Sequence, residues 1–331
     1  MFIRFFKSSF FIQYLVIGLT GLALWAGTFP HPPPMPLPSG PVPLYRILYL
    51  ALSEHPLFAV ILGFLLMMAE TYWLTTILGR HELILKNSSL ASLLFVVMMS
   101  LLPDQLTLNP INIALGLMIL ILHHLLISYN KPEHLDRIFA AGFFTAIASL
   151  FYLPFILWFV LVVISFLVFR AGNWRAWLAA LAGLVTPFMY LATWYFWNDE
   201  ISVRLSEWGE FFRQVTIMPE GFGPDFYWLG GFTLLLALWG LLKFSGGSER
   251  TVEIRVKTSI MLWTLAFTLL SFIYAGPLSP LHTALAIPAL SMVLSGALTG
   301  LKKQRFAEWV FLFYFLSILI NNLLISNLLK I

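Results

Sequence analysis

The sequence predicts an all-α membrane protein: a bundle of about eleven helices that cross the bilayer and form a single domain over residues 1–331. Three observations predict this class. Only 10% of the residues are charged, whereas a soluble domain usually carries about 25%. Apolar stretches of roughly 15 to 24 residues, the length that a transmembrane helix needs, recur along the whole chain. Basic residues concentrate in alternate connections between these stretches, as they do in membrane proteins.

The predicted spans are, in order, the segments 10–27, 56–78, 89–102, 109–128, 136–151, 155–169, 175–197, 226–244, 257–275, 281–300 and 307–328. The first span follows a basic start, as in a signal peptide. Its apolar run is about 18 residues long and no clear Ala-x-Ala site follows, so we expect it to stay uncleaved. Because the third and fifth spans are shorter than the roughly 20 residues of a perpendicular helix, neighbouring helices must shelter them or the bilayer must be thinned around them.

The basic residues predict a cytoplasmic N-terminus and an outer C-terminus. In this orientation fifteen basic residues fall in cytoplasmic segments and four in outer segments, which is the positive-inside asymmetry. The cytoplasmic residues are Arg4, Lys7, Arg80, Lys86, Lys131, Arg137, Arg170, Arg175, Lys243, Arg250, Arg255, Lys257, Lys302, Lys303 and Arg305. The outer residues are Arg46, Arg204, Arg213 and Lys330.

Two outer connections are long, at 28–55 and 198–225, and each contains a predicted surface helix. The stretch "GTFPHPPPMPLPSGPVP" at 27–43 has eight prolines, which favour an extended polyproline II backbone that stays outside the hydrocarbon. Two amphipathic helices on the outer face are predicted by apolar residues at helical spacing, which are Leu44, Ile47, Leu48 and Ala51, then Ile201, Leu205, Trp208, Phe212 and Val215. These helices either pack at the membrane interface or cover a site.

Three ionisable residues are predicted to lie in the cytoplasmic third of the bilayer: Glu70, His123 and His124. Each needs a partner or a purpose, because a charge in a span costs roughly 2.5 to 3.5 kcal/mol. We expect a hydrogen bond between Glu70 and either His123 or His124. The pair would clamp two helices together or relay protons, unless the side chains extend to the interface. No helical spacing typical of metal ligands supports a metal site.

The outer face is the more probable functional side by composition, since eight of the fifteen acids lie there: Glu54, Asp104, Asp199, Glu200, Glu207, Glu210, Glu220 and Asp225. Other chemistry is excluded. The chain has no cysteine, and therefore no thiolate nucleophile or thiolate metal site. It has no glycine-rich nucleotide-binding motif, and its basic residues are too dispersed for nucleic acid. We expect no cofactor.

Residues 83–177 carry the segments "HLDRIFAAG", "ASLFYLPFILW" and "RAGNWRAW", and the basic segment "FFKSS" lies near the N-terminus, at 5–9. In these features it resembles a family of uncharacterised multi-pass inner-membrane proteins of Bacteroidota and their relatives. The resemblance implies a topology and a bacterial lineage, and it implies no activity, because none is established for that family.

The positions of the two long outer loops resemble those of GT-C type glycosyltransferases, which use polyprenyl-linked sugar donors. That family carries a catalytic acid, usually Asp, in the first outer loop, where the only acid of this chain is Glu54. The resemblance implies Glu54 as a base or metal ligand, Asp104 as its helper, and Arg204 or Arg213 as ligands of the lipid phosphate.

Three functions follow as hypotheses. The chain is a non-enzymatic partner or assembly factor in envelope biogenesis or secretion, because no catalytic motif stands out. Alternatively, it is a GT-C-like transferase acting at the outer face, or a transporter or flippase. The expected partners are membrane lipids, with either a polyprenyl-linked lipid or another envelope protein.

Overall fold

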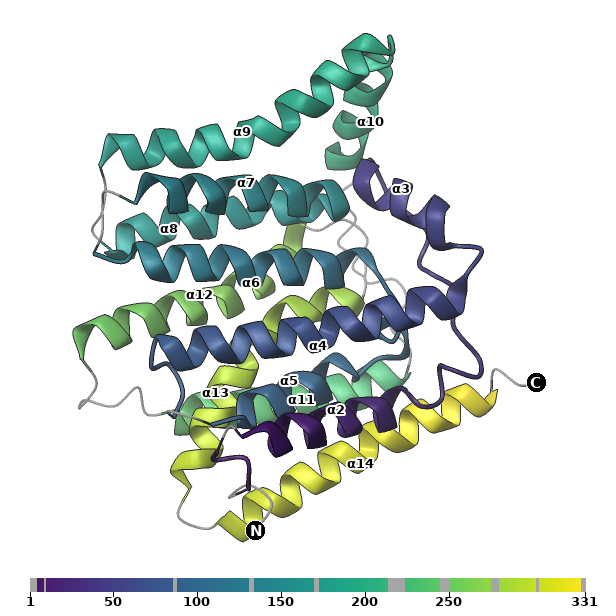
Figure 1. Cartoon of the computed structure of the whole chain (residues 1–331), viewed down its shortest axis with the longest axis vertical. Coiled ribbons are helices and arrows are strands. Elements are labelled where there is room, and N and C mark those ends of the chain that lie inside the picture. Colours follow the sequence, from purple (N-terminus) through teal and green to yellow (C-terminus); the bar gives the residue numbers. More distant parts are fainter. Residues whose placement is uncertain are drawn as a thin grey trace.

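The computed structural model describes residues 5–8, 10–85, 88–130, 134–169, 173–213, 224–244, 251–274, 280–301 and 304–328. Over these residues the chain forms thirteen α-helices, three 3-10 helices and no strand, which confirms the all-α class. Most of the helices lie side by side and run back and forth across the molecule (Figure 1).

The first half of the chain contains α2 (Phe11–Trp25), α3 (Pro43–Leu52), α4 (Pro56–Arg80), α5 (Leu90–Met99), η1 (Pro103–Gln105), α6 (Pro110–Ser128), α7 (Leu135–Phe151), η2 (Leu153–Trp158) and α8 (Phe159–Phe169). The second half contains α9 (Trp174–Trp197), α10 (Ile201–Arg213), α11 (Pro224–Lys243), α12 (Val252–Tyr274), η3 (Pro280–Ala286), α13 (Ile287–Gly300) and α14 (Gln304–Leu328). Each of the eleven predicted spans coincides with a helix, and two of them begin as 3-10 helices at η2 and η3.

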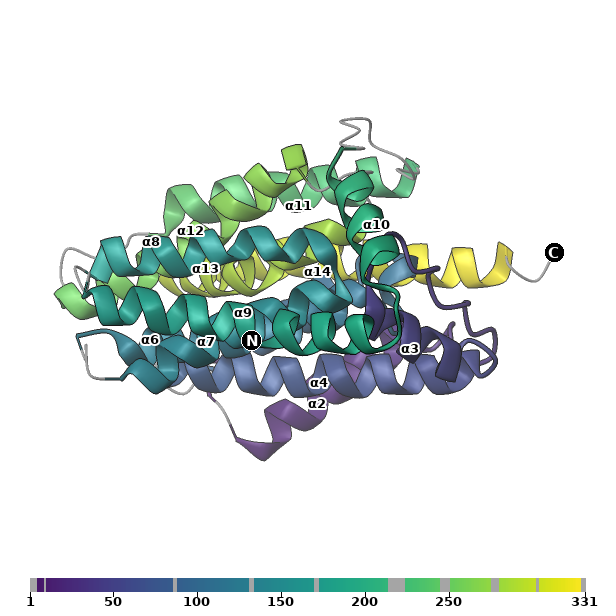
Figure 2. The same cartoon turned by 90° about the horizontal axis from the view of Figure 1, so that it is seen from above.

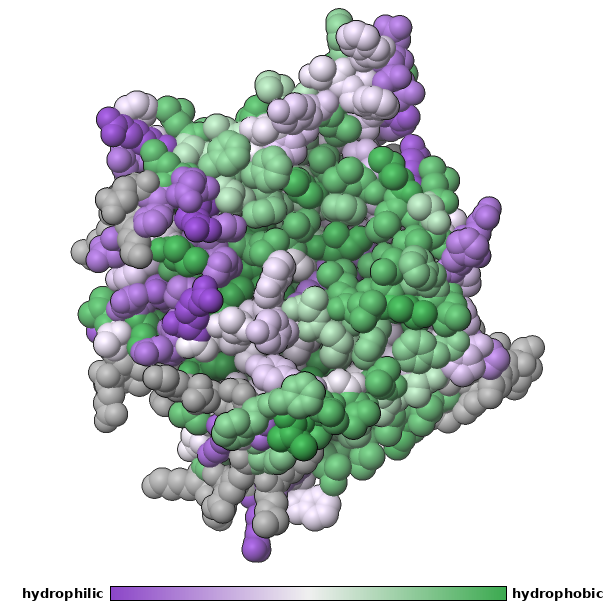
Figure 3. Space-filling model, viewed as in Figure 1, coloured by the Kyte–Doolittle hydropathy of each residue, from purple (hydrophilic) through white to green (hydrophobic). Residues whose placement is uncertain are grey.

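Five of the described helical segments are long and apolar enough to cross a membrane: Pro56–Arg80, Pro110–Ser128, Trp174–Trp197, Phe226–Lys243 and Pro280–Gly300. The surface agrees with this composition, because apolar side chains form a broad band between hydrophilic side chains at the two ends of the helices (Figure 3). Such a band is expected of a protein embedded in a membrane.

The centre of the bundle is α5, in which all ten residues are buried. It packs against α2, α4 and α13. A helix that is apolar on every side is stable only where its whole surface is covered. This burial agrees with the expectation that neighbouring helices shelter the predicted third span. The predicted fifth span, α7, lies between α6 and α9.

The contact between α7 and α9 depends on two glycines. A Cβ atom on Gly183 would overlap the carbonyl oxygen of Phe139 and lie 2.9 Å from the backbone nitrogen of Phe143. A Cβ atom on Gly142 would in turn overlap the carbonyl oxygen of Ala180. The two backbones therefore approach as closely as small residues allow, which is a common way for helices to pack in membranes.

The helix α9 carries the chain from this contact to α10. It contains Pro187, which removes a backbone hydrogen bond and bends a helix. Figure 1 shows that the second half of α9 turns away from α7 toward α10. In both cartoon views α3 and α10 lie next to each other at the same end of the bundle (Figures 1 and 2).

Candidate functional site

The two long connections that the sequence assigns to the outside meet in the structure, and we call this region the α3–α10 end. The proline-rich segment is held against it at two points. The Tyr45 hydroxyl donates a hydrogen bond to the carbonyl oxygen of Pro36 at 2.7 Å. Gly40 has a φ of 79°, and a Cβ atom there would lie 2.6 Å from the ring of Phe211 in α10. Glycine is therefore needed at position 40 both for the backbone angle and for the contact.

The face of α3 that packs on the bundle lies mostly outside the predicted apolar stripe. The packed residues are Tyr45, Leu48, Tyr49 and Leu52, which recur at helical spacing and join a small apolar cluster with Trp208 and Phe211 of α10. Of the predicted stripe, only Leu48 belongs to this packed face. Ile47 is 66% exposed, and Ala51 is also exposed. The predicted helix is present, and because α3 is apolar on both faces, its sequence does not reveal which face packs.

The predicted helix α10 is also present, and part of its apolar stripe packs on the bundle. Trp208, a member of the predicted stripe, is half-buried, and its ring contacts that of Phe188 with centroids 5.5 Å apart. Leu205 of the same stripe is 65% exposed and does not pack on the bundle. Two residues of the outer segments, Val215 and Glu220, lie outside the described residues. The side chains of Phe212 and Asp225 are likewise outside the description.

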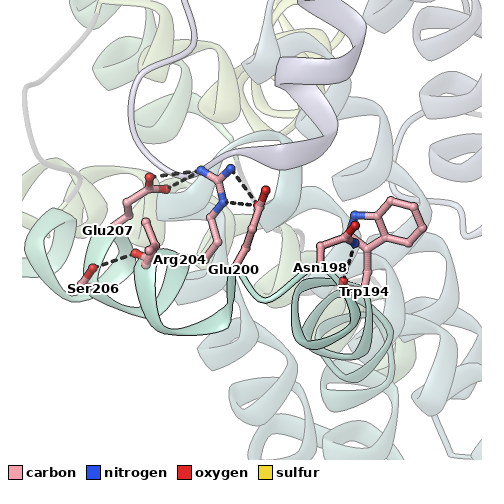
Figure 4. Close-up of polar contacts among 7 residues, drawn as sticks. Trp194, Asn198, Glu200, Arg204, Ser206 and Glu207 are labelled. Carbon is pink, nitrogen blue, oxygen red and sulfur yellow. Dashed lines mark hydrogen bonds and ion pairs between the residues drawn. The ribbon is translucent and has the colours of Figure 1, made fainter.

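Arg204 is neutralised by two carboxylates (Figure 4). Its guanidinium donates to Glu200 at 3.0 and 3.1 Å and to both oxygens of Glu207 at 3.1 Å. It also lies 5.7 Å from the centroid of the Tyr195 ring. The hydrogen bonds from Glu207 and Glu200 raise the pKa of Arg204 and keep the cation fixed. Arg204 is therefore not the free cation that a lipid phosphate ligand would require. Arg213 is exposed at the end of α10.

A groove of about 350 Å³ lies between α3, the end of α9 and α10. Its wall includes Arg46, Trp194, Tyr195 and the carboxylates around Arg204. Arg46 is exposed, and within the described residues no carboxylate forms an ion pair with it. In the sequence, Arg46 stands out only as an outer charge. Its position three residues after Pro43 at the start of α3 places it beside the groove, which only the fold reveals.

The two acids proposed as catalytic residues belong to different elements of this end. Glu54 is exposed between α3 and α4. Asp104 is exposed in η1, and the neighbouring atoms that displace part of its water raise the pKa of its carboxyl. Over the described residues no hydrogen bond or ion pair joins Glu54 to Asp104, and no group of three His, Asp or Glu residues could hold a metal ion.

The turn that holds Asp104 is built by two asparagines. The side chain of Asn109 caps α6 by accepting a hydrogen bond from the backbone nitrogen of Asn112 at 2.8 Å. The Asn112 amide donates to the carbonyl oxygens of Gln105 and Thr107 at 3.4 Å. These bonds satisfy the open end of α6, so both asparagines have a structural role.

The predicted hydrogen bond between Glu70 and a histidine is not formed. Glu70 is 1% exposed, and neither of its carboxyl oxygens has a hydrogen-bond partner in the described chain. Its Oε1 atom faces the backbone of α6 at Gly116, where a Cβ atom would lie 2.9 Å away. The histidines follow about two turns later along α6, roughly 10 Å away. His123 and His124 contact each other, with ring centroids 5.6 Å apart.

His124 is also stacked on the ring of Phe144 in α7, with centroids 5.6 Å apart and an interplanar angle of 15°. The pairing prediction was wrong because it rested on depths estimated for two helices, whereas Glu70 faces α6 at Gly116, about two turns before the histidines. Glu70, His123 and His124 therefore do not form one polar cluster.

A polar cluster that the sequence analysis missed lies at the opposite end of the bundle. The buried ammonium group of Lys257 is 2.6 Å from a carboxyl oxygen of Glu253 and 3.1 Å from Nδ1 of His81. It also lies 5.6 Å from the centroid of the Tyr129 ring. Burial, followed by the charge of Lys257, lowers the pKa of His81 to about 4. His81 is therefore neutral at pH 7, and its Nδ1 accepts a hydrogen bond from the ammonium group.

Only part of this second cluster could have been read from the sequence. Glu253 and Lys257 are four residues apart on a helix, a spacing that favours an ion pair. His81, in contrast, lies 176 positions away from Lys257 in the sequence.

Comparison of the chain with protein-family models, curated proteins and solved structures found no match. The function is therefore argued from the geometry alone.

Proposed function

We propose that the chain is an integral protein of the bacterial inner membrane that crosses the bilayer eleven times, with its N-terminus in the cytoplasm and its C-terminus outside. In this proposal α3 and α10 are the outer surface helices, and they bind another envelope protein. The role is that of a non-enzymatic partner or assembly factor in envelope biogenesis or secretion.

The observation that supports this proposal best is the exposed apolar face of α3. The helix is apolar around its whole circumference except at Arg46. The bundle covers one face through Tyr45, while Ile47 is 66% exposed and Leu50 is 72% exposed on the opposite side. Exposed apolar residues that lie together mark an interaction surface.

The neighbouring helix α10 also exposes apolar residues. Val203 is 57% exposed and Leu205 is 65% exposed. The charges beside them are satisfied within α10, since Arg204 is paired with Glu200 and Glu207. An apolar surface bordered by compensated charges favours a protein partner, because interface centres are depleted of unpaired charge.

The geometry supports the enzymatic alternative less. A GT-C-like transferase needs an acid close to a cation that is free to bind the lipid phosphate. Glu54 and Asp104 belong to separate connections. Within the described residues Arg46 is an unpaired cation beside the groove, but the two carboxylates in the groove wall are already bound to Arg204. The GT-C-like role and the family resemblance stay alternatives, as does transport.

Site-specific photocrosslinking in growing cells tests the proposal. A photoreactive amino acid at Leu50 or at Leu205 should give a discrete protein adduct. Matched controls at Trp73 and Leu181, which are 48% and 45% exposed on the sides of the bundle, should give none. The substitution Leu50→Glu should abolish the adduct formed from position 205 without lowering the melting temperature.

The opposite results are equally clear. If positions 50 and 205 form adducts only with lipid, as the two control positions would in a bilayer, α3 and α10 merely pack at the membrane interface. A protein adduct from position 205 that survives Leu50→Glu would show that the two helices do not form one binding surface.

A further inference from the structure

A second groove lies at the far end of the bundle from α3, between α2, α5 and the first half of α14. Its volume is about 520 Å³. Most of its wall is apolar, and the side chains that form it include Leu93, Phe311, Leu312 and Phe315. On the other side of Phe311 lies an apolar hollow of about 260 Å³ between α11, α13 and α14. The first half of α14 is thus flanked by apolar space on two sides.

Charged residues border the groove at one end only. Arg305, in the first turn of α14, lines it and is exposed, and within the described residues no carboxylate pairs with this guanidinium. Glu308 also lines the groove, but it already interacts with another group of the chain.

An indole completes the polar end. Trp309 lines the groove next to Glu308 and is 70% exposed. Tryptophan is enriched where a membrane protein meets the headgroup region, because its ring is apolar and its N–H is polar. The groove therefore combines the features that match a phospholipid: apolar walls for the acyl chains, then an indole and a free cation at the depth of the headgroup.

We propose that this groove binds one anionic phospholipid, with its acyl chains beside α14 and its phosphate at Arg305. In a bilayer the apolar walls give no preference, because a lipid chain is as apolar outside the groove as inside it. The headgroup decides the affinity, since each basic residue near the surface contributes about 1 kcal/mol toward an anionic lipid. The proposal rests on the membrane location and is independent of what the α3–α10 end binds.

Native mass spectrometry of the full chain in detergent tests this site. Phosphatidylglycerol and phosphatidylcholine with identical acyl chains are titrated separately, and the affinity for the first bound lipid is compared. Phosphatidylglycerol should bind about fivefold more tightly, which corresponds to about 1 kcal/mol for one arginine. Arg305→Ala should remove this difference, while Arg305→Lys should retain most of it.

Two controls separate the site from general surface charge and from simple anion binding. Arg255→Ala removes an exposed cation of α12 outside the groove and should leave the preference unchanged. Leu312→Trp fills the apolar groove and should weaken both lipids without a change in charge. Glycerol phosphate, the headgroup without acyl chains, should not displace the lipid at concentrations near that of the lipid.

Several results would overturn the proposal. An equal affinity for the two lipids in the unmodified chain would do so, as would the same loss from Arg255→Ala as from Arg305→Ala. Displacement by glycerol phosphate alone would show an anion site without a lipid. If Arg305→Ala proved less stable, two other variants would still test the lipid site: Arg305→Lys, which keeps the positive charge, and Leu312→Trp, which changes no charge.

Discussion

The substitution Gly183→Ala should separate α9 from α7 and destabilise the protein. A Cβ atom at position 183 would overlap the carbonyl oxygen of Phe139 and lie 2.9 Å from the nitrogen of Phe143. Both neighbours are backbone atoms of a packed helix, so they cannot rotate away as a side chain could. Because comfortable contacts lie near 3.5 Å, the helices must move apart by about 1 Å.

The expected magnitude comes from two opposing effects. Overpacking of this kind costs about 1 to 3 kcal/mol, and the better helix propensity of alanine returns up to about 1 kcal/mol. We therefore expect a net loss of about 1 to 2 kcal/mol of unfolding free energy. The double substitution with Gly142→Ala should cost less than the sum of the single ones, since helices that have already separated accommodate the second methyl group.

Gly18→Ala is a matched control, because a Cβ atom on Gly18 in α2 would have no neighbour within 4 Å. Chemical unfolding in detergent, followed by the fluorescence of the 12 tryptophans, measures all these variants. Gly18→Ala should be as stable as the unmodified chain or slightly more stable. If Gly183→Ala were as stable as Gly18→Ala, the close approach of α7 and α9 would be refuted.

Two further predictions concern α14 and the polar cluster of His81, Glu253 and Lys257. Asn322 of α14 donates hydrogen bonds to the carbonyl oxygens of Leu24 at 3.3 Å and Ser100 at 2.9 Å. Asn322→Leu should therefore lower the unfolding free energy by about 1 to 3 kcal/mol. An unchanged unfolding free energy would show that these bonds do not hold α14. Burial and Lys257 lower the pKa of His81 to about 4. The unfolded chain therefore binds more protons than the folded chain between about pH 6.5 and this value, so stability should fall as the pH is lowered through that window. His81→Gln should flatten the pH dependence of the melting temperature, and an unaltered slope would contradict the assignment.

The positions of the helices could be predicted from the sequence, because apolar length and turn residues are local properties. The segment 136–151, for example, was predicted within one residue of α7. The rotation of each helix about its axis could not be predicted in the same way. The helix α3 presents apolar residues on both faces, and only the arrangement of its neighbours makes Tyr45 the buried one.

The candidate site was predictable only where its interactions are local. Glu200, Arg204 and Glu207 lie within two turns of one helix, so the sequence spacing already contains their ion pairs. The contact of Gly40 with Phe211 joins two connections that are far apart in the sequence. Glu70 illustrates the opposite failure, since it faces α6 at Gly116 and its supposed partners lie about two turns farther along that helix.

Labelling of single cysteines in spheroplasts tests the proposed membrane arrangement most directly, because the unmodified chain has no cysteine that would react. Glu54→Cys places a thiol at the α3–α10 end, and Asp136→Cys places one at the opposite end, where the native side chain is 69% exposed. A membrane-impermeant maleimide should label position 54 in intact spheroplasts and position 136 only after lysis. Labelling of both positions before lysis, or of position 136 alone, would contradict the arrangement.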